Sequence, residues 1–231
     1  IKPASYRRNQ WAMVYVCEAC GYSKVMPLKS KAEAPIALVR FVREVRSMCG
    51  VEPGCKTTRK GKIVFAGIHS DNEPALRGEY WREAVHKMGL QELHSVPFSP
   101  QMNGTCERLV GTVKSALRTT MHNVDPKVWD FCAEHISKVW NIKNSSKASR
   151  HSQDGMPKCP EDIMEQTSEN PLYKSGIRKR KYLKRFGCLA FFKRDVDPDG
   201  AEEQKSYALR PRRVKGIHLG FSEKNSSWLI G

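Results

Sequence analysis

The sequence contains no apolar run long enough to span a membrane, and its opening residues, IKPASYRRNQ, do not have the apolar core of a signal peptide. From these two absences we expect an intracellular chain that is not secreted and has no membrane partner. Acidic residues are also few, because 24 Asp and Glu accompany 40 Lys and Arg and leave a net charge of +16. Such an excess predicts a polyanionic partner, with nucleic acid favoured over a merely soluble basic protein.

Cysteines at disulfide-type spacing are also scarce. The eight cysteines are scattered, and several stand in apolar runs, such as Cys132 in VWDFCAEHI and Cys188 in FGCLAFF. We therefore expect reduced thiols that act as small core residues. Only Cys17 and Cys20 in VCEACG have the spacing of zinc ligands, and no second Cys or His pair follows at a zinc-finger distance, so zinc is the less favoured interpretation.

The apolar periodicity predicts strands followed by helices. Residues 10–31 are typical of two adjacent strands that meet at Cys20-Gly21, and 31–48 of a helix in which Ile36, Val39, Val42 and Val45 recur at helical spacing. A buried central strand, IVFAGI, ends in His69-Ser70-Asp71. Further helices are expected within 74–90, 104–121 and 123–142, and further short strands within 93–100, 183–194, 212–221 and 226–231.

This order of elements predicts a three-layer α/β domain. After residue 142 the apolar period is lost, and the chain up to about residue 181 is predicted to be an irregular polar connector. The basic cluster RKRKYLKR, residues 178–185, suits a nuclear import signal, a DNA contact or a solvated connector. A small β unit is expected after it.

One predicted helix carries a single acid, since Glu107 is the only acidic residue between Glu92 and Asp125. At roughly 100° per residue its apolar side chains gather on one face. These are Leu109, Val113, Ala116 and Leu117. The opposite face carries Glu107, Gly111, Lys114 and Arg118. An ordinary amphipathic helix with a favourable acid in its first turn is one interpretation. A face that binds both a metal and an anion is the other.

Several motifs in fixed order decide between these interpretations. They are PLKSK at 27–31, SDN at 70–72, FSPQMNG at 98–104 and Glu107-Arg108. Together they resemble the integrase core of copia-type LTR retrotransposons, a retroviral-like family whose last two catalytic acids have the spacing of Asp71 and Glu107. FGCLAFF at 186–192 and KGIHLGFS at 215–222 are similar to the small β-barrel that follows this core in copia polyproteins.

The resemblance implies a fold and its boundaries. The fold is an α/β, ribonuclease H-like three-layer domain, with a mixed sheet and flanking helices, followed by a small all-β barrel-like domain. The expected parts are 1–142 for the catalytic core without its first strand, 143–181 for a polar and basic connector, and 182–231 for the small β-barrel domain or a part of it.

The resemblance also implies an activity, DNA integration by a DDE-type polynucleotidyl transferase that processes element ends and joins them to target DNA. Two Mg²⁺ or Mn²⁺ ions would serve this chemistry, and carboxylates are their preferred ligands. A homo-oligomeric full-length protein and a nuclear location are expected. The implied catalytic and metal-binding residues are Asp71 and Glu107, and the implied DNA contacts are Gln101, Asn103, Lys114 and Arg118. For Arg108 a salt bridge and a DNA contact are equal alternatives.

Some features depart from the family pattern. Residues 1–70 contain no aspartate, so we expect the first catalytic Asp to lie upstream of Ile1 and the chain as given to be inactive, with Glu18 as an unfavoured substitute. Glu73 and Pro74 replace two family glycines and are expected to stiffen the loop after Asp71. Gly111 replaces a basic residue. The alternatives are a catalytically dead, transposon-derived nucleic-acid-binding protein and a different ribonuclease H-like nuclease.

Overall fold

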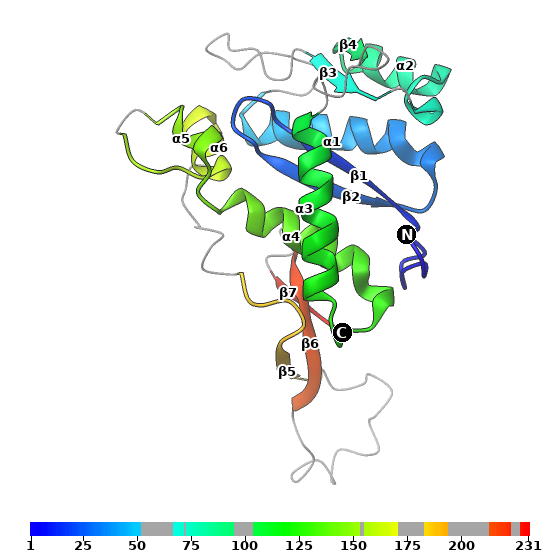
Figure 1. The fold of residues 1–231 in the computed structure, drawn as a ribbon, viewed down its shortest axis with the longest axis vertical. Coiled ribbons are helices and arrows are strands. Elements are labelled where there is room, and N and C mark those ends of the chain that lie inside the picture. Colours follow the sequence, from blue (N-terminus) through cyan, green and yellow to red (C-terminus); the bar gives the residue numbers. More distant parts are fainter. Residues whose placement is uncertain are drawn as a thin grey trace, which may run out of the picture.

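The computed structural model describes residues 1–51, 67–71, 73–94, 104–152, 155–170, 183–193, 213–222 and 227–231. It shows a mixed α/β chain with small sheets (Figure 1). None of the described helices is both long and apolar enough to cross a membrane. The strands are β1 (Trp11–Val16), β2 (Ser23–Leu28), β3 (Gly67–Ser70), β4 (Gln91–His94), β5 (Leu189–Lys193), β6 (Arg213–Ser222) and β7 (Ser227–Ile230). The α-helices are α1 (Ala34–Met48), α2 (Glu79–Lys87), α3 (Gly104–Thr120), α4 (Trp129–Asn141), α5 (Ser146–Ser149) and α6 (Pro160–Thr167).

β1 and β2 form an antiparallel hairpin in which Trp11 lies opposite Leu28. This confirms the two strands predicted on either side of Cys20-Gly21. Successive side chains of a strand point to opposite faces, and both faces of this hairpin are covered. Tyr15 and Met26 belong to the core that contains α1, whereas Val25 belongs to the core that contains α3 and α4.

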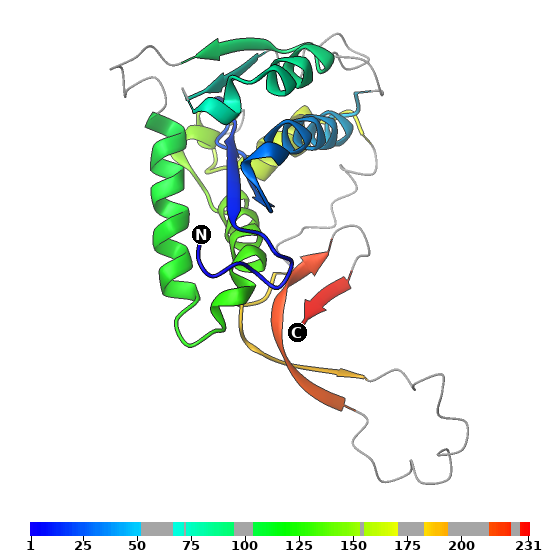
Figure 2. The same cartoon turned by 90° about the vertical axis from the view of Figure 1, so that its right-hand side faces the viewer.

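Helices therefore pack on both faces of the hairpin. α1 contributes Leu38 and Phe41 to one core, and α3 and α4 contribute Leu109 and Cys132 to the other. Figure 2 shows α1 and α3 on opposite sides of β1. The predicted helices are present, although Ile36 in α1 is 62% exposed and is not part of the buried stripe.

β3 and β4 form a second, parallel sheet, in which Gly67 lies opposite Gln91. α2 connects them and packs on α1 through Trp81, which is almost fully buried and donates its indole N–H to Glu92 Oε1 at 2.8 Å. Of the predicted strand IVFAGI, only Gly67 and Ile68 lie within the described residues. In that part of the chain β3 pairs with β4 alone and β1 with β2 alone.

The prediction that 143–181 is irregular is wrong in the described part, which contains α5 and α6. Pro160 begins α6, and Asp162 Oδ2 accepts the Cys159 main-chain N–H at 2.7 Å. Proline followed by acids is a recognised helix start. Met164 then packs into the core of α1, so tertiary contacts stabilise a helix that is too short to show an apolar period.

The C-terminal strands β5, β6 and β7 confirm the short strands predicted there and pair in that order, all antiparallel. Within the described ranges they form an open three-stranded sheet and not the expected barrel, because three strands are too few to close. Leu219 on β6 and Phe186 ahead of β5 pack into the core of α3 and α4. The described sheet therefore shares its core with the α/β part.

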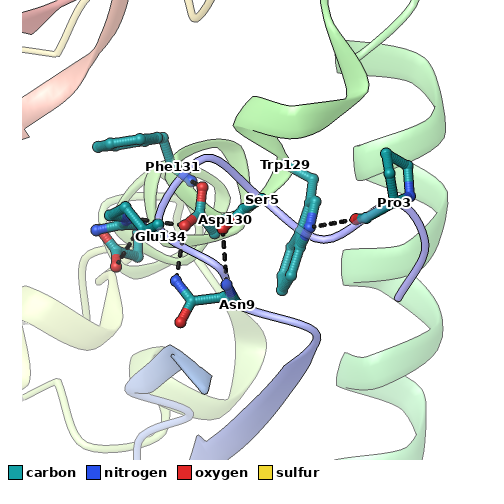
Figure 3. Close-up of polar contacts among 8 residues, drawn as sticks. Pro3, Ser5, Asn9, Trp129, Asp130, Phe131 and Glu134 are labelled. Carbon is teal, nitrogen blue, oxygen red and sulfur yellow. Dashed lines mark hydrogen bonds and ion pairs between the residues drawn. The ribbon is translucent and has the colours of Figure 1, made fainter. Parts of the chain in front are cut away.

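The N-terminal segment is tied to α4 through Asp130, which is fully buried (Figure 3). Asp130 Oδ2 accepts hydrogen bonds from Arg7 Nε at 2.6 Å and from Asn9 Nδ2 at 2.7 Å. The neighbouring Trp129 donates its indole N–H to the Pro3 carbonyl at 3.2 Å. These contacts fix the chain that leads into β1.

Candidate metal and nucleic-acid site

Asp71 follows β3 directly and its side chain is exposed. Its Oδ1 accepts a hydrogen bond from the Glu73 main-chain N–H at 3.3 Å, just before the short 3-10 helix η2 (Pro74–Leu76). The carboxyl end of a parallel strand is where α/β folds usually present functional groups. The main chain thus orients the Asp71 carboxylate at such a position.

Glu107 lies in the first turn of α3, where the helix dipole favours an acid. The opposite face of the helix packs into the core that contains α3 and α4. Leu109 and Val113 are buried there, and Ala116 and Leu117 pack beside them. The four residues predicted for the polar face are all exposed: Glu107, Gly111, Lys114 and Arg118. The prediction of two distinct faces on this helix is confirmed.

Cys106 lies in the first turn of α3, next to Glu107. Its half-buried thiol donates to the Val14 carbonyl at 3.7 Å, so the first turn of α3 rests on β1. Burial raises the pKa of the Cys106 thiol, and the charges of Asp71 and Glu107 raise it further. Glu107 is the next residue in the chain, whereas Asp71 comes from another element.

The two carboxylates suit part of a site for a hard divalent cation. Carboxylate oxygens are preferred ligands of Mg²⁺, and exposed side chains leave space for the waters that Mg²⁺ retains. Cys106 is unsuited as a ligand because its soft sulfur has a raised pKa. Among the described residues, no group of three or more His, Cys, Asp or Glu side chains is placed to hold a metal ion.

Glu73 adds a negative charge beside Asp71, and that charge is paired. Its carboxylate forms an ion pair with Lys31, whose Nζ also lies 4.4 Å from the centre of the Trp11 ring. Lys31 ends the PLKSK motif, so this motif contacts the loop that follows Asp71. Together with Pro74 at the start of η2, these contacts support the expected stiffening of the loop.

Lys147 was not predicted as a neighbour of the site. It lies in α5, and its Nζ donates to Thr105 Oγ1 in the first turn of α3 at 3.4 Å. The helix that carries it is short and is capped by Ser145, whose Oγ accepts the Ala148 main-chain N–H at 3.0 Å. Nothing in the sequence distinguishes Lys147 from the other cations of the connector, because its position depends on how α5 packs.

The remaining candidates are placed as follows. Gln101 and Asn103 lie outside the described residues. Arg108 is exposed and forms no ion pair within the described part, which gives no support to its salt-bridge alternative. Glu18 is exposed in the turn after β1 and is not among the acids that act on Cys106. The structure therefore places Asp71 directly after β3 and Glu107 in the first turn of α3, with Lys114 and Arg118 on the same face of α3 as Glu107.

Comparison with known proteins adds no relative to these findings, because no protein-family model matches the chain and no curated protein matches it. The function must accordingly be argued from the ordered sequence motifs and from the geometry around Asp71 and Glu107.

Proposed function

We propose that this chain is part of a copia-type retrotransposon integrase, a DDE polynucleotidyl transferase with a ribonuclease H-like core, and that it acts in DNA integration. The observation that carries the proposal is that Asp71 and Glu107 are exposed acids at the end of β3 and in the first turn of α3. The two acids come from a strand end and a helix start, in the order of the SDN and Glu107-Arg108 motifs. The mixed α/β arrangement, with helices packed on both faces of the β1–β2 hairpin, supports the same assignment.

Asp71 and Glu107 would hold Mg²⁺ or Mn²⁺. When bound, two such ions activate the attacking oxygen and stabilise the leaving oxygen of a phosphodiester. The protein's own groups prepare the ligands for this role. The Glu73 main-chain N–H orients Asp71, and the apolar face of α3 fixes the helix turn that presents Glu107. Lys31 pairs with the Glu73 carboxylate, which lessens its repulsion of a DNA phosphate.

The DNA partner is proposed from charge and from the exposed face of α3. Lys114 and Arg118 stand seven and eleven positions after Glu107 and are both exposed. At 1.5 Å per residue they lie roughly 10 and 16 Å beyond Glu107 along the helix axis. A DNA strand held at Glu107 would therefore pass both cations, which contact its phosphates without reading its sequence.

The proposal includes a third acid on a strand encoded ahead of Ile1. Within the described residues β1 pairs with β2 alone, which leaves its other edge for such a strand.

The test is metal-dependent DNA joining by a chain extended with its own upstream coding sequence. We expect end processing and strand transfer with Mg²⁺ or Mn²⁺, and a loss of roughly a hundredfold or more in Glu107→Gln and Asp71→Asn, because each change removes a metal ligand. Glu83→Gln, at an exposed acid on α2, is the matched control and should join normally. Joining that survives Glu107→Gln would refute the assignment.

A second candidate is a transposon-derived nucleic-acid-binding protein without catalysis. It is favoured by the sequence of residues 1–70, which contains no aspartate to serve as the first acid of the family pattern. It predicts salt-sensitive DNA binding and no joining under any metal, even in the extended chain. Lys114→Ala with Arg118→Ala should reduce the slope of log affinity against log salt by about 0.9 per lost phosphate contact under either candidate. The joining assay alone separates them.

A further inference from the structure

Cys17 and Cys20 share a single turn between β1 and β2. The Gly21 main-chain N–H donates to the Cys17 carbonyl at 2.9 Å and closes one helical turn, while the Cys17 N–H donates to the Tyr22 carbonyl at 2.7 Å and continues the hairpin. Residues three apart in such a turn lie on the same side. The two cysteine side chains accordingly lie on the same side of this turn.

The two thiols differ in their access to solvent. Cys20 is 3% exposed, and its sulfur accepts the Tyr22 main-chain N–H at 3.4 Å. Cys17 is only half-buried, so a small reagent can reach it. Cys49, at the end of α1, is buried, and burial together with the nearby charge of Cys17 raises the pKa of Cys49 to about 11. Cys17 is thus the accessible member of this thiol cluster.

The neighbouring Cys20 thiol and the charge of Lys147 favour a thiolate at Cys17. Interaction with Cys20 is the largest cause that lowers the pKa of Cys17, and Lys147 lowers it further. The same interaction, together with burial, raises the pKa of Cys20. Negative charge therefore resides on the better solvated sulfur, as solvation requires. A low thiol pKa combined with exposure is characteristic of a reactive cysteine.

We propose that Cys17 and Cys20 form a redox-active dithiol that low-molecular-weight disulfides oxidise to an intramolecular disulfide. The Cys17 thiolate attacks one sulfur of the small disulfide, forms a mixed disulfide and expels one thiolate. The expelled thiolate takes the Cys20 proton, and the Cys20 sulfur then attacks the Cys17 sulfur and expels the second thiolate. One small disulfide is reduced to two thiols while the protein dithiol is oxidised.

This dithiol is independent of the proposed integrase activity. Neither cysteine is placed at the two acids, and no metal-ligand role is required of them. The fold supplies what exchange needs: a turn that holds the two sulfurs together, one accessible thiolate and one buried thiol to resolve the mixed disulfide. The hydrogen bond between His151 Nε2 and the Ala19 carbonyl, 3.2 Å, further fixes the turn.

Peptide mass spectrometry on the full chain tests the proposal. The reduced protein is exposed to oxidised glutathione, quenched and digested. We expect the first product to be the Cys17–Cys20 disulfide. In Cys20→Ala the mixed disulfide of glutathione with Cys17 should accumulate, because no resolving thiol remains. In Cys17→Ala the buried Cys20 should stay unmodified. Cys188→Ser, at a half-buried cysteine ahead of β5, is the control and should oxidise like the wild type.

A second measurement uses the wild type alone. The rate of iodoacetamide alkylation at Cys17 should rise with a midpoint below the ordinary thiol value of about 8.5, because the pKa of Cys17 is lowered. An ordinary midpoint in the wild type would overturn the proposal. So would a first disulfide that pairs Cys17 with Cys49 or another residue, or the absence of any glutathione-driven oxidation.

Discussion

Asp130 and the pair formed by Asp71 and Glu107 are acidic groups in opposite surroundings. Asp130 is fully buried and its oxygens accept hydrogen bonds from Arg7, Asn9 and the following main-chain N–H. Asp71 and Glu107 are exposed. Of this pair, Asp71 accepts a hydrogen bond from the main chain two residues further on, at Glu73.

The difference separates acids that stabilise the fold from acids that are available to a ligand. A buried carboxylate must have its oxygens satisfied by the protein, because an uncompensated buried charge is very costly. An exposed carboxylate with few protein donors keeps its lone pairs for water or a cation. Stability and metal dependence should therefore respond oppositely to changes at the two places.

Replacing Asp130 by Ala should have the largest effect on stability. The change leaves Arg7 and Asn9 without their acceptor and opens a cavity beside α4, so we expect a loss of about 3 kcal/mol in the free energy of unfolding. Urea denaturation measures it. Glu134→Ala is the control, since the Glu134–Arg7 ion pair is half-exposed and worth about 1 kcal/mol or less. Equal stability of the two variants would show that Asp130 does not anchor the N-terminal segment.

His135 in α4 should make the free energy of unfolding depend on pH. Burial, with the charges of His218 and Lys138, lowers the pKa of His135 from 6.5 to about 4. In the unfolded chain the imidazole takes up a proton as the pH falls below about 6.5. The free energy of unfolding therefore keeps its full value above pH 6.5. It decreases by about 3 kcal/mol in total as the pH falls towards 4.

The measurement is the free energy of unfolding at several pH values between 7 and 4. His135→Leu should flatten the pH dependence, because Leu cannot take up a proton in either state. His122→Gln, at an exposed histidine, should retain the wild-type slope. A slope that His135→Leu leaves unchanged would assign the acid sensitivity to other groups, among them His218, whose pKa burial also lowers.

Replacing Gly111, on the exposed face of α3, should have a smaller effect and should raise the free energy of unfolding. A methyl group added there meets nothing within 4 Å, so Gly111→Ala should stabilise the protein by up to about 1 kcal/mol through helix propensity. Thermal unfolding measures it. Gly50→Ala is the control of opposite sign, because Gly50 has φ +79° and its added methyl would lie 2.8 Å from the Asn170 nitrogen. Destabilisation by Gly111→Ala would mean that this face is covered.

The sequence predicted those parts of the molecule whose apolar pattern is local and strong. The β1–β2 hairpin, α1, α4 and the two faces of α3 are of this kind. The pairing of Asp71 with Glu107, which was inferred from ordered motifs, stays a prediction. α6 was missed because its burial depends on packing against α1, which no local pattern encodes.

Long-range polar contacts were equally invisible in the sequence. The bond between Arg7 and Asp130 joins residues 123 positions apart, and the approach of Lys147 to Thr105 depends on the placement of α5. The β-barrel was expected from resemblance, whereas the described strands form an open sheet that uses the core of α3 and α4. Periodicity identifies strands and helices, but it does not specify which of them share a core.

The smallest change in stability should follow from Asp71→Asn combined with Glu107→Gln. Both side chains are exposed, the amide oxygen introduced by Asp71→Asn can still accept the Glu73 N–H, and the lost interaction with the dipole of α3 is worth roughly 0.5 kcal/mol. Thermal unfolding without metal should therefore barely change. In the extended chain, Mg²⁺ should raise the wild-type Tm by mass action and leave that of the double variant unchanged. A large decrease in Tm without metal would show that these two acids stabilise the fold, as Asp130 does. A rise in Tm with Mg²⁺ that persists in the double variant would show that the cation binds elsewhere.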